Sequence, residues 1–132
     1  MKVLALDYGR ARTGVAVSDP TGTIARPLCV IERAGSDDGL ARLASLIAEE
    51  AAERVVVGLP LTLQGARGEQ ARETEAFIEA LRARTDVPVD TFDERFTTDL
   101  AERTETAKAA EDARAAAHLL SSYLAWSSGA RA

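Results

Sequence analysis

The chain has almost none of the residues on which cysteine and histidine chemistry depends. Its 132 residues include one cysteine, Cys29, and one histidine, His118. A single cysteine excludes a disulfide within the chain, and the two residues together cannot assemble a cysteine- or histidine-rich zinc site. Any metal ion would therefore be held by carboxylate oxygens, which 21 aspartate and glutamate residues can supply.

Long apolar runs and an excess of positive charge are also missing. No apolar run approaches the ~18 residues of a membrane span, and Asp7 interrupts the first apolar stretch too early for a signal peptide. We therefore expect a cytoplasmic protein with no membrane partner. The formal net charge of −5 argues against nonspecific nucleic-acid binding through overall charge, although it leaves a local basic patch open.

The apolar content is sufficient for one packed core. Hydrophobic residues make up 46% of the chain and charged residues 28%, which is typical of a globular domain of this length. We expect a single domain over residues 1–126 and a flexible C-terminal tail over residues 127–132.

The apolar patterns predict a mixed sheet flanked by helices. Strands are expected at residues 2–7, 13–18, 23–32, 54–58 and 87–92, and helices at 37–51, 69–84, 97–103 and 111–126. Pro27 should keep the third strand at an edge, whereas the run Val55–Val57 is typical of a parallel strand at the sheet's centre. The order indicates an α/β fold in which a three-stranded antiparallel meander is joined to two parallel strands.

Acidic residues stand where two of these strands end and where the last helix begins. Asp7 ends the first strand, and Asp93 and Glu94 end the last, so parallel strands would bring them to one edge. Strand alternation allows only one of Asp93 and Glu94 to face the Asp7 side. Asp112 lies near the start of an alanine-rich helix that can approach the sheet closely. The alternatives are a turn residue for Asp7 and an ordinary helix N-terminal acid for Asp112.

Carboxylates that converge in this way indicate metal chemistry. They would repel one another without a cation, and Mg²⁺ or Mn²⁺ prefers oxygen ligands. Two such ions ~3.5–4 Å apart can activate water and stabilise the leaving oxygen in phosphodiester hydrolysis. Arg12 and Arg95 lie beside the carboxylates, where they could bind a substrate phosphate or form ion pairs with those same carboxylates.

Four ordered motifs resemble one known family over nearly the whole chain. They are Asp7-Tyr-Gly-Arg-Ala-Arg12-Thr-Gly14-Val-Ala-Val-Ser-Asp19, Val57-Gly58-Leu-Pro60-Leu, Asp93-Glu94-Arg95-Phe-Thr97-Thr98 and Asp112-Ala-Arg-Ala115-Ala116. Together they resemble the YqgF/RuvX family. The resemblance implies an RNase H-like fold and a metal-dependent nuclease that uses Mg²⁺ or Mn²⁺. By motif position it implies that Asp7, Glu94 and Asp112 are the catalytic, metal-binding residues.

The family is described both in maturation of the small-subunit ribosomal RNA precursor and in Holliday-junction resolution. Members commonly carry a longer lysine-rich stretch before the final aspartate, whereas residues 99–111 here have only Arg103 and Lys108 as bases. This reduced basic surface and the negative net charge favour precursor ribosomal RNA as the substrate over a four-way DNA junction.

Other function classes stay open. One is a noncatalytic nucleic-acid or protein binding module. The other is a nucleotide-binding domain of the actin and sugar-kinase type, for which this chain lacks the second lobe. The chain could act as a monomer or as a homodimer.

Overall fold

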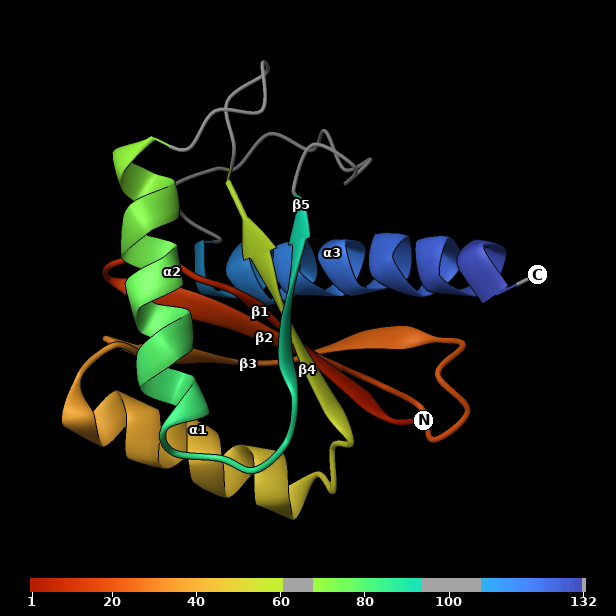
Figure 1. Cartoon of the computed structure of the whole chain (residues 1–132), viewed down its shortest axis with the longest axis horizontal. Helices are drawn as coiled ribbons and strands as arrows, with labels where there is room; N and C mark the ends of the chain where they lie inside the picture. The colour runs from red at the N-terminus through yellow and green to blue at the C-terminus, as the bar shows by residue number, and fades with distance from the viewer. Residues whose placement is uncertain (61–67, 94–107, 132) are drawn as a thin grey trace.

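The fold is known from a computed structural model, which describes residues 1–60, 68–93 and 108–131 (Figure 1). Its strands are β1 (Val3–Asp7), β2 (Arg12–Ser18), β3 (Ala25–Glu32), β4 (Arg54–Leu59) and β5 (Val89–Asp93). Its helices are α1 (Asp37–Glu49), α2 (Glu69–Arg82) and α3 (Lys108–Arg131). The helix expected at residues 97–103 lies outside the described residues.

The five strands form one mixed sheet in the order β3-β2-β1-β4-β5. The strands β1, β2 and β3 pair antiparallel, and β1, β4 and β5 pair parallel. The predicted α/β architecture is therefore confirmed, and β3 with Pro27 takes an edge as expected. The prediction that the Val55–Val57 strand occupies the centre is wrong, because β1 lies there and β4 is its neighbour. Both strands are buried on two faces, so burial alone could not rank them.

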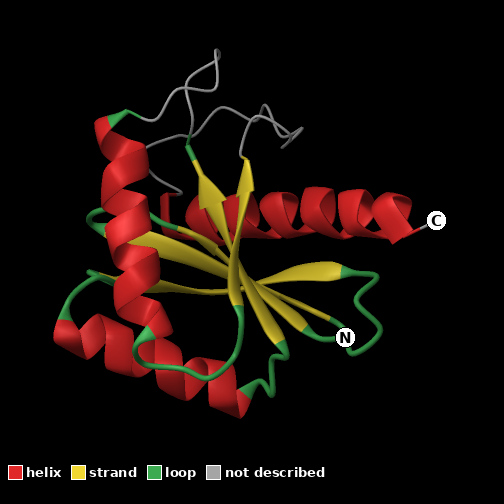
Figure 2. Cartoon of the chain, viewed as in Figure 1, coloured by secondary structure: helices red, strands yellow, loops and turns green. Residues whose placement is uncertain are grey.

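Alternate residues of each strand serve two different cores. Leu4, Leu6 and Val57 pack under α1 and α2, whereas Ala5 and Val56 pack under α3. Figure 2 shows the resulting arrangement, with a long helix on one side of the sheet and two shorter helices on the other. The parity of a strand residue therefore tells which helices its side chain faces.

The last helix is longer than expected. It begins by Lys108, before the predicted start at residue 111, and it continues through residues 127–131, which we expected to form a flexible tail. Ser127, Ser128 and Gly129 are weak helix formers. A helix already established on the sheet by buried residues such as Leu120 can nevertheless extend through them. Among the described residues, no helix is long and apolar enough to cross a membrane.

Candidate active site

Asp7 lies at the carboxyl end of the central strand, on the face that α3 covers. Val3 and Ala5, which share its parity in β1, belong to the core beneath α3. Asp7 itself is half-buried, and its cross-strand partner in β2 is Gly14. The strand thus carries the Asp7 carboxylate on a rigid element at the sheet's edge.

Gly14 is the point at which α3 meets the sheet. A Cβ atom placed on Gly14 would lie 1.9 Å from the carbonyl oxygen of Asp112, so only glycine leaves room for the helix backbone here. The backbone of α3 fills the space that a side chain at position 14 would occupy. Because Gly14 is the partner of Asp7, this contact brings Asp7 and Asp112 together on one face.

Asp112 is buried, with 8% of its surface exposed. It was expected in the first turn of its helix, but α3 begins by Lys108, so at least four helical residues precede Asp112. The helix dipole favours an acid chiefly within the first turn, so the alternative of an ordinary N-terminal acid explains Asp112 poorly. Close packing against β2 is what places this carboxylate.

Arg12 forms an ion pair with Asp112. It begins β2, two residues before Gly14 and on the same face, and its Nε lies 3.2 Å from the Asp112 carboxylate. The ion-pair alternative for Arg12 is therefore observed in this structure. A buried carboxylate is costly without a countercharge, and Arg12 supplies one.

The structure separates Asp93 from this face. Phe92 precedes it in β5 and packs beneath α3, with its ring centroid 5.7 Å from that of Tyr123. Alternation then directs Asp93 to the face of α1 and α2, away from the side of Asp7 and Asp112. Glu94 and Arg95 lie outside the described residues.

The turn between β1 and β2 is tied to α2. Tyr8 stacks on Phe77 with centroids 4.4 Å apart, which agrees with a packing role for Tyr8. Arg10 forms an ion pair with Glu73 beside a surface pocket of about 560 Å³. The fully buried Thr13 lies with its hydroxyl 3.4 Å from the Gly9 nitrogen, a role that sequence reasoning missed. The packing of Tyr8 and the contact of Thr13 hold the segment between Asp7 and Arg12.

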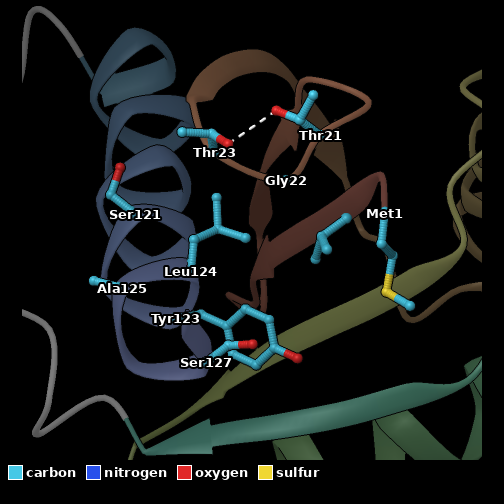
Figure 3. Close-up of a pocket in the computed structure, with 10 residues that line it drawn as sticks. Met1, Thr21, Gly22, Thr23, Ser121, Tyr123, Leu124, Ala125 and Ser127 are labelled. Atoms are coloured by element: carbon cyan, nitrogen blue, oxygen red, sulfur yellow. Dashed lines mark hydrogen bonds between the residues drawn. The ribbon is translucent and has the colours of Figure 1, made fainter. Parts of the chain in front are cut away.

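A second pocket, of about 270 Å³, lies at the other end of α3 (Figure 3). It is lined by the start of β1, the β2–β3 turn and residues of α3 such as Tyr123 and Leu124. The hydroxyls of Thr21 and Thr23 are 2.9 Å apart at its rim. No acidic side chain of the described chain lines it, so it does not offer the carboxylate chemistry expected of the site.

The two predicted ligands that the structure describes, Asp7 and Asp112, suit a hard divalent cation. Asp7 and Asp112 offer only oxygen atoms, which Mg²⁺ and Mn²⁺ prefer. Within residues 1–60, 68–93 and 108–131, no group of three or more candidate ligands gathers. Two of the three predicted ligands thus share one face, and the third, Glu94, falls outside these ranges.

Comparisons with known proteins show the family of the chain. A family model described as "RuvX: Holliday junction resolvase" matches residues 1–126. A proposed pre-16S rRNA nuclease of Chloroflexus aggregans is 46% identical over 101 residues, which are 76% of this chain and 71% of that relative. Proteins of the same name in Anaeromyxobacter sp. and Syntrophomonas wolfei are 42% and 37% identical over 132 residues. These matches span 94% of this chain and 96% and 94% of the relatives.

A solved structure shares the fold. T. thermophilus RuvC, in complex with a Holliday junction substrate, matches with a TM-score of 0.61 and 17% identity over 98% of this chain and 96% of that chain. The likeness extends over the whole sheet and its helices, and it confirms the expected RNase H-like fold. Nucleases with this fold depend on divalent metal ions and act on nucleic acid. The family match and the identities to full-length relatives show that the chain belongs to the YqgF/RuvX family of nucleases.

Proposed function

We propose that the chain is an endonuclease that uses Mg²⁺ or Mn²⁺ to hydrolyse phosphodiester bonds in structured RNA. Its substrate would be the small-subunit ribosomal RNA precursor, which it would cut during 5′-end maturation. The observation that carries the proposal is the meeting of Asp7 and buried Asp112 on one face of the sheet, through the contact at Gly14. The names of the full-length relatives support the choice of RNA.

Glu94 is the third carboxylate of the proposed site. Of the two adjacent carboxylates Asp93 and Glu94, Asp93 faces α1 and α2, so Glu94 is the one that we include in the site. The same position carries the acidic residue of the motif that resembles the family's. We therefore assign the metal to Asp7, Glu94 and Asp112, and we leave Asp93 outside the site.

The chain's own groups then have distinct tasks. Asp7, Glu94 and Asp112 would hold the divalent ions, which when bound would supply an activated water and stabilise charge on the leaving oxygen. Asp7 and Asp112 hold their oxygens in place because one is carried by the central strand and the other by a helix packed on it. Arg12 and Arg95 bind phosphate oxygens of the substrate through planar donor groups, which orients the scissile bond.

Cleavage of four-way DNA junctions is the second candidate. The description of the matching family model favours it. Against it stand the net charge of −5 and the few bases between residues 99 and 111, because binding to duplex arms relies on neutralising many phosphates. Cutting both strands of a junction would also call for a homodimer, whereas cutting one RNA strand needs only a monomer.

The proposal is tested with purified wild type and Asp7→Asn, which removes a charge and preserves shape. Labelled single-stranded RNA, precursor small-subunit ribosomal RNA and four-way DNA junctions are incubated with Mg²⁺ or Mn²⁺. We expect metal-dependent cutting of the precursor by wild type only. Preferred cutting of the junction would favour the second candidate. Equal cutting by both proteins would indicate a contaminating nuclease. If wild type also bound no divalent metal, a noncatalytic binding module would be favoured.

A further inference from the structure

The ion pair between Arg12 and Asp112 joins two residues with different proposed roles. Asp112 is assigned to the metal, and Arg12 is assigned to a substrate phosphate. We propose that Arg12 is a positioning residue that neutralises Asp112 until a divalent cation binds there. When the cation binds, the guanidinium of Arg12 leaves Asp112 and pairs with a substrate phosphate. The inference rests on the proposed function, because it takes Asp112 to be a metal ligand.

Arg12 is the more exposed partner of its ion pair with Asp112. The Asp112 side chain is 11% exposed and that of Arg12 is 34% exposed, while Nε of Arg12 lies 3.2 Å from the carboxylate. Solvent therefore reaches the Arg12 guanidinium more readily than it reaches the Asp112 carboxylate. A substrate phosphate can therefore reach this guanidinium from solvent.

The backbone lets the side chain exchange partners without disturbing the fold. Arg12 begins β2, and its backbone pairs with Glu32 of β3. Asp112 is fixed by the packing of α3 on Gly14. Only the flexible side chain of Arg12 has to move, by rotation about its own bonds, when another cation takes its place.

Electrostatics gives the direction of the exchange. A buried carboxylate needs a countercharge, and the guanidinium provides one before any metal is bound. A divalent cation carries twice that charge and repels the guanidinium beside it, which weakens the ion pair. The phosphate that binds next restores an anionic partner for Arg12. Arg12 thus disfavours metal binding and favours substrate binding.

Arg10 provides a matched control in the same turn. It lies two residues before Arg12, its side chain is 78% exposed, and it pairs with Glu73 of α2. Removing its charge takes one positive charge from the same surface and leaves the pair between Arg12 and Asp112 in place.

The test is a calorimetric Mn²⁺ titration of the full chain as wild type, Arg12→Gln, Arg12→Lys, Arg10→Gln and Asp112→Asn. We expect Arg12→Gln to bind Mn²⁺ about fivefold or more tightly, because a competing cation is gone. Arg12→Lys and Arg10→Gln should stay within about twofold of wild type. With saturating Mn²⁺, Arg12→Gln should raise KM for the RNA about tenfold. A merely structural role would weaken metal and substrate binding together.

The outcomes separate this inference from the proposed function. Unchanged or weaker Mn²⁺ binding by Arg12→Gln, with binding lost in Asp112→Asn, overturns the inference and leaves the nuclease site standing. Wild-type binding by Asp112→Asn overturns both. If Arg12→Gln does not fold, the Nε–H resonance of Arg12 is followed in wild type during Mg²⁺ addition. A clear shift is expected, and a resonance that does not move overturns the inference.

Discussion

Asp93 and Glu94 are adjacent carboxylates that we expect to differ in their effect on catalysis. Asp93 lies on the sheet face covered by α1 and α2, while Asp7 and Asp112 lie on the other. Glu94→Gln should therefore lower the single-turnover cleavage rate about 100-fold or more, because it would remove a proposed metal ligand. Asp93→Asn should retain most of the rate. The reverse order of the two variants would contradict the assignment.

Asp19 should make stability depend on pH. Its carboxylate accepts hydrogen bonds from the Ile24 N–H at 2.8 Å, from the Thr21 hydroxyl and from the Thr23 N–H at 2.8 Å. These bonds, that of Ile24 foremost, lower the pKa of Asp19 far below its usual range. A depressed pKa in the folded state stabilises the protein above the unfolded pKa of about 3.9, and the effect is lost as pH falls below that value.

Asp19→Asn should consequently melt at a lower temperature than wild type at pH 7 and pH 5. The difference in melting temperature should narrow as the pH falls below about 4. The Asp19 carboxylate of the unfolded wild-type chain then becomes protonated, which removes the stabilising effect of its lowered pKa in the folded state. Thermal melts followed by circular dichroism at pH 7, 5 and 3 measure this. A difference that stays constant over this range would show that the charge of Asp19 does not stabilise the turn.

At the scale of elements, the packing of α3 on β2 depends on Gly14. The backbone of Asp112 occupies the space in which a Cβ atom would stand, so Gly14→Ala must push the helix from the sheet. We expect it to lower the free energy of unfolding by about 1–3 kcal/mol, as other overpacked sites do. Cleavage should fall as well, because the shift displaces Asp112 from Asp7.

Gly68→Ala is the control for this substitution. Gly68 is the N-cap of α2, and no described atom lies within 4 Å of a Cβ placed on it. It should cost no more than about 1 kcal/mol, the range of N-cap exchanges. Urea unfolding measures both variants, and equal losses would mean that the contact at Gly14 is not what seats α3.

Local patterns predicted the elements better than their contacts. The alternation in β2 and the valine run of β4 identified strands because both are imposed by sheet burial. Alternation also predicts that only one of Asp93 and Glu94 faces the Asp7 side, and this stays a prediction because Glu94 lies outside the described residues. Two contacts could not be predicted: that of α3 with Gly14, and the ion pair of Arg12 with Asp112 in particular. Both depend on how distant segments of the chain pack. The end of α3 was missed because tertiary packing outweighed the weak helix propensity of residues 127–129.

At the scale of the molecule, metal binding should be coupled to folding. The site joins the first strand to the last helix, so it exists only in the folded chain. Mn²⁺ at about 100 times its Kd should stabilise wild type by about 2.7 kcal/mol, with a matching rise in Tm. Asp112→Asn should show little or no rise. An equal rise in both proteins would place the ion elsewhere on this acidic chain.

The same site predicts the result of one direct measurement, the single-turnover rate of precursor ribosomal RNA cleavage in saturating Mn²⁺. Wild type and Asp112→Asn are compared with Asp38→Asn, which removes the same charge from an exposed position at the start of α1. We predict a loss of about 100-fold or more in Asp112→Asn and a rate near wild type in Asp38→Asn. Cleavage by Asp112→Asn at the wild-type rate would contradict a carboxylate-held metal centre between the central strand and the last helix.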